Sequence, residues 1–204
     1  TSGTTSPNVD VVNTKYYRAL VKSGVCNALP SNEVLVTVNQ ASSAGTISPV
    51  TQTICYNATP TAITLTNPVG LIQWQTSTSA VGGYNDIVGQ TSLTLPSGSI
   101  SNTATGYYKA VVTNGVCPSA TITATVNVDL ATVAGTAAIS AGTSTICANT
   151  TAPVINLTGY TGSIQWQSSL ISGGTFTNTS GTTSPNVDVV NTKYYRSEER
   201  RVGK

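Results

Sequence analysis

The sequence predicts an all-β chain made of antiparallel β-sandwich modules of about 90 residues in tandem. Three observations support this fold class. Apolar and polar residues alternate with period two, and no stretch shows the period of a helix. Turn-forming residues interrupt these runs at intervals of about 8–12 residues, as in known sandwiches. The chain also repeats itself, and an internal repeat is stronger evidence of architecture than any single motif.

The repeat is exact at the two ends of the chain and looser between them. Residues 1–18 recur letter for letter as residues 179–196. The looser copies, at offsets of about 90 residues, are 53–57 with 145–149, 72–75 with 164–167, 16–18 with 107–109 and 24–26 with 115–117. The exact repeat therefore spans two modules, and the chain is a stretch of a tandem array.

These offsets predict the domain boundaries. We expect residues 1–44 to be the C-terminal part of one module, 45–133 a complete module and 134–196 the N-terminal part of a third. Residues 197–204 differ in composition, since five of the eight are charged in a chain that is 8% charged. Read with Arg196, they resemble the translation of a short-read sequencing adapter, so we exclude them from the predicted fold. A natural charged tail is the alternative.

The strands of the complete module follow from alternation and turns. Residues 62–66, 71–75 and 121–128 alternate as half-buried strands do. The side chains expected to face the core are Ile63, Leu65, Ile72, Trp74, Ile122, Ala124, Val126 and Val128. Asn114 and Gly115 follow the strand 108–113 and are expected to form a hairpin turn, because both residue types tolerate positive φ. The recurrence of Asn57 as Asn149 is interpreted as turn geometry.

The order of motifs TIC, ITLT, IQWQ and YYKAVVTNGVC resembles the immunoglobulin-like repeats of large Bacteroidetes surface proteins of the adhesin and gliding-motility-associated type. The resemblance covers residues 1–196. It implies an immunoglobulin-like sandwich exported to the cell surface, through the type IX secretion route. Core and structural roles follow for Trp74, Trp166, Tyr107 and Tyr108, one of the two tyrosines forming a tyrosine corner. A ligand platform is the alternative role for these aromatic residues.

Four cysteines occupy two repeated positions. Cys55 and Cys147 lie in the front half of the module, and Cys26 and Cys117 lie in the back half. Only the complete module holds both, so we predict a Cys55–Cys117 disulfide, with Cys26 and Cys147 unpaired in this stretch. The antibody disulfide is not carried over, because Ala110 stands where those domains have their second cysteine. A disulfide indicates an oxidising compartment, so the predicted location is extracellular or at the cell surface.

Composition argues against several classes of function. The sequence has no His, so the usual general base and common metal ligand is missing, and no Cys-x-x-Cys spacing is present. The complete module has two carboxylates, Asp86 and Asp129, which we expect to be solvated surface charges. A net charge of +2 is too small to predict nucleic-acid binding, and no apolar run approaches the roughly 20 residues of a membrane span. We expect no enzyme, no cofactor and no metal.

Two functions remain. The favoured hypothesis is a structural stalk or adhesive repeat of a large secreted bacterial surface protein, which supplies length and multivalency without catalysis. Its partners would be neighbouring repeats of the same array, and surface glycans or other cells. The alternative is a carbohydrate-binding module in a surface polysaccharide-degrading protein. That function needs exposed aromatic residues, for which the candidates are Tyr56, Tyr84 and Tyr160.

Overall fold

The structure is a computed structural model that describes residues 8–181, 185, 187–189 and 192–200. The chain divides into two compact units, Thr1–Asp129 and Leu130–Lys204, each described here by itself. Strands are almost the whole of the regular secondary structure in both, and a single short 3-10 helix, Ser97–Ser99, occurs among the described residues. The predicted all-β fold class with antiparallel sandwich modules is therefore confirmed.

The first unit begins with two small antiparallel sheets. One pairs β1 (Lys15–Tyr17) with β4 (Val34–Val36), and the other pairs β2 (Leu20–Val21) with β3 (Leu29–Pro30). Most side chains of these strands are exposed, so this part of the unit has little core of its own.

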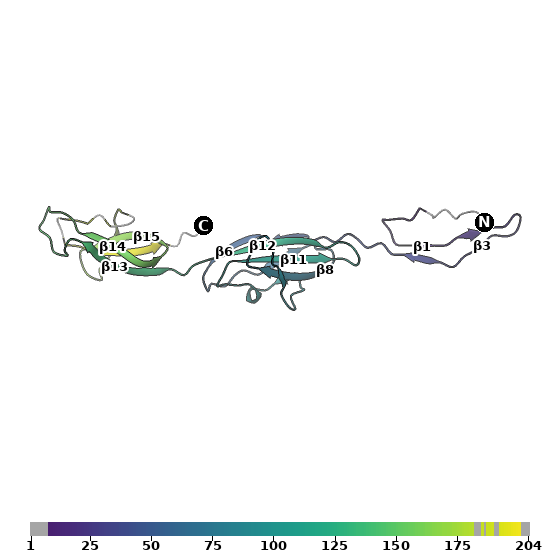
Figure 1. The fold of residues 1–204 in the computed structure, drawn as a ribbon, viewed down its shortest axis with the longest axis horizontal. Helices are drawn as coiled ribbons and strands as arrows, with labels where there is room; N and C mark the ends of the chain where they lie inside the picture. The colour runs from purple at the N-terminus through teal and green to yellow at the C-terminus, as the bar shows by residue number, and fades with distance from the viewer. Residues whose placement is uncertain (1–7, 182–184, 186, 190–191, 201–204) are drawn as a thin grey trace. The chain divides into compact units, whose positions relative to one another are not determined.

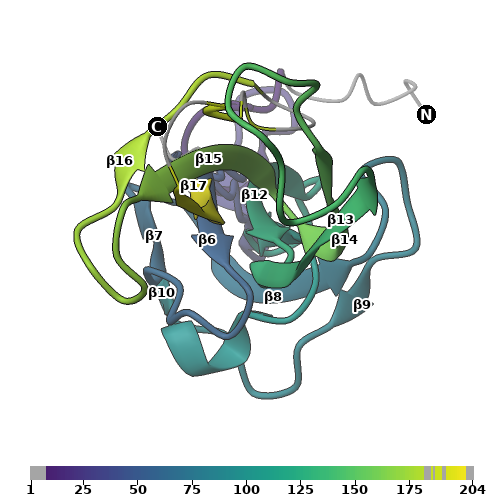
Figure 2. The same cartoon turned by 90° about the vertical axis from the view of Figure 1, so that its left-hand side faces the viewer.

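The rest of the first unit, called the central module below, is a sandwich of two sheets (Figure 1). The larger sheet has the order β6-β12-β11-β8-β9 and contains β6 (Thr51–Cys55), β12 (Ala120–Asp129), β11 (Gly106–Thr113), β8 (Leu71–Ser77) and β9 (Asn85–Asp86). The smaller sheet has the order β10-β7-β5 and contains β10 (Thr94–Leu95), β7 (Ile63–Thr66) and β5 (Thr46–Ser48). Figure 2 shows β7 and β10 side by side.

One pairing in the larger sheet is parallel. β6 runs in the same direction as β12, with Thr51 opposite Thr125 and Cys55 opposite Asp129. The other pairings of both sheets are antiparallel. Because of the parallel pair, the first strand of the larger sheet and the last strand of the module end at the same end of the sandwich.

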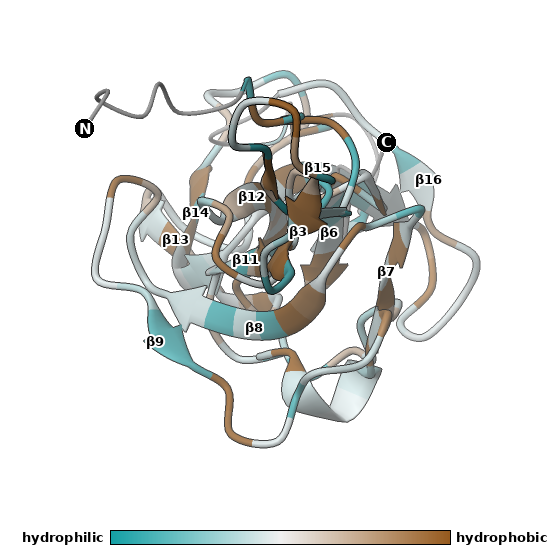
Figure 3. Cartoon of the chain, turned by 90° about the vertical axis from the view of Figure 1, so that its right-hand side faces the viewer, coloured by the Kyte–Doolittle hydropathy of each residue, from teal (hydrophilic) through white to brown (hydrophobic). Residues whose placement is uncertain are grey.

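The core fills the space between the two sheets. The smaller sheet contributes Ile47, Ile63, Leu65 and Leu95, and the larger sheet contributes Trp74, Tyr108, Ala110, Val112, Ala124 and Val126. The predicted inward residues Ile72, Ile122 and Val128 are half-buried against this cluster. Along β8 in Figure 3, a hydrophobic start gives way to less hydrophobic positions, and in the sequence Gln73 and Gln75 lie on either side of Trp74. Alternation in the sequence thus predicted the core face.

The turn between β11 and β12 differs from the prediction. Val112 pairs with Ala120, so the loop covers residues 113–119 and is longer than a two-residue turn. Gly115 has a φ of 57°, whereas Asn114 is not among the residues with positive φ. The amide of Cys117 closes the turn on the carbonyl of Asn114 at 3.1 Å. Asn57 and Asn149 do have positive φ, 63° and 62°, as their interpretation as turn residues requires.

The second unit repeats the front half of this plan. β13 (Val133–Ala141) pairs with β14 (Val154–Thr161), and β15 (Ser163–Ser169) lies between β16 (Thr177–Asn178) and β17 (Tyr194–Arg200). Residues 197–200, which the sequence analysis excluded from the fold, continue β17 opposite residues 163–166. Residues 143–147, the counterpart of β6, form no strand. No described strand of this unit takes the place of β12.

Candidate functional site

The two ends of the central module are the parts that a repeated chain has to connect. The entrance end holds residues 39–45, where the chain arrives, and the loop 113–119 between β11 and β12. The exit end holds Cys55 at the close of β6 and Asp129 at the close of β12. β12 begins beside the entrance end and finishes at the exit end, so it carries the chain through the module.

The cysteines lie at these opposite ends, and the predicted Cys55–Cys117 disulfide is wrong for this structure. Cys117 precedes the first residue of β12, whereas Cys55 pairs with its last residue. A ten-residue strand is about 30 Å long, and a disulfide needs Cα atoms within about 7 Å. All four cysteines are free thiols, and Cys26 and Cys147 are exposed. Sequence spacing could not reveal that β6 runs parallel to β12 and thereby takes Cys55 to the far end.

At the entrance end, the loop 113–119 binds the arriving chain. The Asn114 amide donates to Ser42 Oγ at 2.9 Å, and Asn114 Nδ2 donates to the Gln40 carbonyl at 2.8 Å. The Cys117 thiol lies 3.4 Å from the Gln40 carbonyl oxygen and 3.6 Å from that of Asn39. Sequence reasoning treated Asn114 as a turn residue only, although its amide also holds the linker.

At the exit end, the backbone that follows Cys55 binds the last residue of β12 and the loop around Asn102. The amide of Tyr56 donates to the Asp129 carbonyl at 2.9 Å, directly after the Cys55–Asp129 pair of the parallel ladder. The amide of Asn57 donates to the Asn102 carbonyl at 2.7 Å. Each end of the module therefore carries one cysteine, and the contacts at the entrance end hold the connecting segment.

The second tyrosine of each Tyr-Tyr pair forms a tyrosine corner. The hydroxyl of Tyr108 accepts the backbone amide of Ser101 at 2.6 Å, and that of Tyr17 accepts the amide of Asp10 at 2.7 Å. Tyr195 accepts the amide of Asp188 in the same way. Tyr108 is buried in the core, whereas Tyr107 is half-buried. Sequence reasoning had left the choice between Tyr107 and Tyr108 open.

An ion pair accompanies two of these three corners. Lys15 Nζ lies 2.5 Å from Asp10 Oδ2, and Lys193 Nζ lies 2.6 Å from Asp188 Oδ2. The Lys15 ammonium, together with the amides of Val12 and Asn13, holds the pKa of Asp10 well below its usual value. Asp10 and Asp188 raise the pKa values of their lysines in return.

The two tryptophans fill equivalent positions. Both are fully buried, Trp74 on β8 and Trp166 on β15. Trp74 Nε1 donates to the Ser92 carbonyl at 2.9 Å. Trp166 Nε1 has no hydrogen-bond partner among the described residues. Burial places both rings in the interior, so neither offers a face to a ligand.

The aromatic residues of the glycan-binding alternative are divided between the two units. Lys109 Nζ lies 3.6 Å from the centre of the Tyr84 ring and covers one of its faces. Arg196 lies over Phe176, the counterpart of Tyr84, at 4.2 Å. Tyr56 and Tyr160 are each 42% exposed, but they belong to different units.

The two carboxylates of the central module are not brought together. Asp86 lies on the edge strand β9 and accepts a hydrogen bond from Gln75 Nε2 at 2.8 Å. Asp129 lies at the exit end, opposite Cys55. In the part of the chain that the structure describes, no three His, Cys, Asp or Glu residues are grouped as a metal site would need. Nor does any described helix have the length and apolarity of a membrane span.

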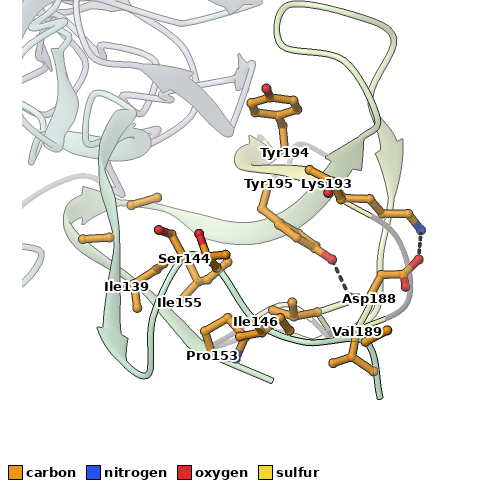
Figure 4. A pocket seen from close by; sticks show the side chains of 16 residues that line it. Ile139, Ser144, Ile146, Pro153, Ile155, Asp188, Val189, Lys193, Tyr194 and Tyr195 are labelled. Carbon is orange, nitrogen blue, oxygen red and sulfur yellow. Dashed lines mark hydrogen bonds and ion pairs between the residues drawn. The ribbon is translucent and has the colours of Figure 1, made fainter. Parts of the chain in front are cut away.

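A cavity of about 470 Å³ lies in the second unit (Figure 4). Ile139, Ile146, Pro153 and Ile155 line it, with the Asp188–Lys193 pair and Tyr195 across from them. Ile146 is the counterpart of Ile54, which pairs with Val128 of β12 in the central module. Since no described strand replaces β12 here, we interpret the cavity as unfilled sandwich interior.

Comparison with known proteins gave two findings. Residues 43–132 and 133–203 each match a domain of unknown function, DUF8696. Among solved structures, the chain is similar to a Ca²⁺-stabilised adhesin that helps an Antarctic bacterium reach out and bind ice, with 14% identity and a TM-score of 0.32. That match covers 92% of this chain and 48% of the adhesin, so the chain spans about half the length of that structure. A search of curated proteins gave no significant match.

Proposed function

The chain belongs to the DUF8696 family, whose domain it carries twice in direct succession, and we propose that this domain is a spacer module. Modules in series would build a stalk or adhesive array in a large secreted bacterial surface protein. The array would supply length and multivalency without catalysis. Its immediate partners would be neighbouring modules of the same array.

The observation that carries this proposal is the path of the chain through the central module. The chain arrives beside the loop 113–119 and leaves after Asp129, at the opposite end of β12. A module of this kind adds the length of β12, about 30 Å, between its neighbours. A domain whose two ends lay side by side would add little reach.

Contacts at the entrance end support a stiff connection. Asn114 holds both Gln40 and Ser42 of the arriving segment. The repeat keeps a hydroxyl at the Ser42 position, since Thr132 is its counterpart at the next junction. The glycine three positions further along is kept as well: Gly45 and Gly135 both have positive φ, 65° and 69°. Fixed connecting segments favour a semi-rigid array over freely tumbling domains.

Glycan binding by aromatic residues has weaker support. Tyr84 has one face covered by Lys109, and its counterpart Phe176 has one covered by Arg196. These paired contacts fit a packing role on the sheet surface. Affinity electrophoresis against a polysaccharide panel tests the point: retardation that is lost on replacing Tyr56 and Tyr160 with Ala would favour the glycan-binding alternative.

The spacer proposal is tested by lengthening the chain. A second copy of residues 43–132, inserted between residues 132 and 133, recreates a junction between matched domains. Small-angle X-ray scattering should show the maximum dimension increasing by about 30 Å, the length of β12. An unchanged maximum dimension with a more compact particle would contradict the proposal.

A further inference from the structure

The cysteines at the two ends of the central module are free thiols and lie too far apart to bond to each other. We propose that they join successive modules: the cysteine at the exit end of one module, the Cys55 position, forms a disulfide with the cysteine at the entrance end of the next, the Cys117 position. This inference deepens the spacer function proposed above and rests on it for its biological meaning. Its geometry comes from the first unit alone.

Asn39 lies in the segment that connects the first partial module to the central module. Asn39 is the counterpart of Asp129, 90 residues later in the repeat. In the central module, Cys55 pairs with Asp129, and the amide of the next residue, Tyr56, donates to the Asp129 carbonyl at 2.9 Å. In the module before it, the exit-end cysteine would pair in the same way with Asn39.

The entrance-end cysteine reaches the same residue from the other side of the junction. The Cys117 thiol lies 3.6 Å from the Asn39 carbonyl oxygen. The backbone amide that follows the exit-end cysteine would donate to that same oxygen, as Tyr56 does at Asp129. Both cysteines of a junction therefore approach one carbonyl oxygen, an arrangement compatible with the Cα separation of up to about 7 Å that a disulfide requires.

The four free thiols agree with this pairing. Cys117 needs an exit-end cysteine from the module before it, but residues 1–44 contain only Cys26, an entrance-end cysteine. Cys55 needs an entrance-end cysteine from the module after it, but residues 134–204 contain only Cys147, an exit-end cysteine. The 204 residues thus hold no pair of the proposed type. The structure accordingly leaves all four thiols unbonded.

The chemistry is ordinary thiol–disulfide exchange. One thiolate of the junction attacks a small disulfide such as oxidised glutathione, forming a mixed disulfide and releasing one glutathione thiol. The second thiolate then displaces the other glutathione. The two cysteine thiols lose two protons and two electrons, and the oxidised glutathione is reduced to two thiols. The product is one covalent bond across each junction in addition to the peptide chain.

A chain with two complete modules tests the inference. The lengthened chain described above, with Cys26→Ser and Cys147→Ser, contains two exit-end and two entrance-end cysteines. A matched variant keeps Cys55 in the first copy and Cys117 in the second copy, and the other two cysteines become Ser. A reversed variant keeps Cys117 in the first copy and Cys55 in the second copy. The two variants have the same composition.

Incubation with oxidised glutathione should distinguish the two variants. In the matched variant both thiols should be converted to an intrachain disulfide. The displacement of glutathione by the second thiolate is intramolecular there, so we expect it to be about tenfold or more faster than in the reversed variant. The reversed variant should keep mixed glutathione disulfides, since its cysteines lie at the outer ends of the pair. Equal behaviour of the two variants would overturn the proposal.

Two further measurements keep the result interpretable. Peptide mapping of the lengthened chain with all of its cysteines present, and with Tyr56→Phe and Val116→Ile in the second copy alone to give its peptides different masses, should find Cys55 of the first copy linked to Cys117 of the second copy. A link within one copy would also overturn the proposal, and this readout does not depend on how Ser variants fold. Scattering from the reduced chain separately reports the spacer function, so the disulfide can fail while the added length remains.

Discussion

The central module and the second unit contain the same front-half motifs, yet among the residues that the structure describes only those of the central module form a closed sandwich. In the central module the Thr-Ile-Cys segment is the strand β6, whereas residues 143–147 of the second unit form no strand. Trp74 donates a hydrogen bond to Ser92, whereas Trp166 has no partner among the described residues. The interior beside Ile146 holds a cavity of about 470 Å³.

The difference between the two regions is β12. In the central module this strand pairs with both β6 and β11 and places Ala124 and Val126 in the core. Without a described strand in that position, the β6 counterpart has no described strand to pair with, and a segment of strand-like sequence is not enough to make a strand. The last strand of the module therefore organises the first strand of its larger sheet, about 70 residues away in the sequence.

The largest predicted effect contrasts the two tryptophans. Trp74→Ala should destabilise the central module by about 3–5 kcal/mol, because it empties a fully enclosed core position and leaves the Ser92 carbonyl without its donor. Trp166→Ala should cost less, since the surrounding sandwich is incomplete. Hydrogen exchange with mass spectrometry reads the two units separately. Equal losses of protection in β11 and β15 would show that the second unit is as well packed as the central module.

The next prediction concerns two glycines of the central module, one of them at its entrance end. Gly45 has a φ of 65°, and an added Cβ would overlap the backbone carbonyl oxygen of Thr66. Gly89 has a φ of 75° but open space around it. Gly89→Ala should cost about 1–2 kcal/mol of left-handed strain, and Gly45→Ala should cost clearly more. Urea unfolding monitored by Trp74 fluorescence in a Trp166→Phe background measures the free-energy cost of each substitution. Equal costs would show that the contact between the added Cβ and Thr66 does not matter.

A smaller effect is expected at the tyrosine corner of the central module. Tyr108→Phe removes the acceptor of the Ser101 amide and should cost about 1–2 kcal/mol. Tyr107→Phe is the matched control on the neighbouring residue, which is only half-buried, and should change stability by less than about 0.5 kcal/mol. The same urea assay applies. A larger effect at Tyr107 than at Tyr108 would reverse the assignment of the corner.

The smallest predicted effect is a dependence of stability on pH, which the flanking copies should show and the central module should lack. Ser101 and Gly106 replace the Asp10–Lys15 pair in the central module. The lowered pKa of Asp10 means that its contribution to stability is present above about pH 4, the unfolded value, and is lost as pH falls through the folded value. Carboxyl-carbon NMR should show Lys15→Ala raising the pKa of Asp10, with Lys22→Ala leaving it unchanged. If Lys15→Ala left the pKa of Asp10 unchanged, the ion pair would not be the cause of its lowered value.

The sequence predicted the parts of the fold that depend on local pattern. Alternation identified the inward faces of β7, β8 and β12, including Ile63, Trp74 and Val126. Internal repetition identified equivalent residues in different modules. Both signals depend on residues close in sequence or on direct comparison of copies, so they can be read without a structure.

The sequence could not predict strand direction in the larger sheet, and the wrong disulfide follows from that. Nothing in residues 51–55 shows that they pair parallel with 125–129, so Cys55 was expected near Cys117. The double role of Asn114 was also missed, because its contacts to Gln40 and Ser42 join residues more than 70 positions apart. Long-range pairing of this kind leaves no local signal in a single sequence.

The placement of the two cysteine positions at opposite ends of one module is the claim on which the spacer function and the junction disulfide both depend. Spin labels on Cys55 and Cys117, in a full chain with Cys26→Ser and Cys147→Ser, allow this distance to be measured by pulsed electron paramagnetic resonance. We predict a single distribution centred at about 30–40 Å, the length of β12 and its preceding turn. A distance below about 10 Å, or a disulfide between the two residues before labelling, would contradict the account.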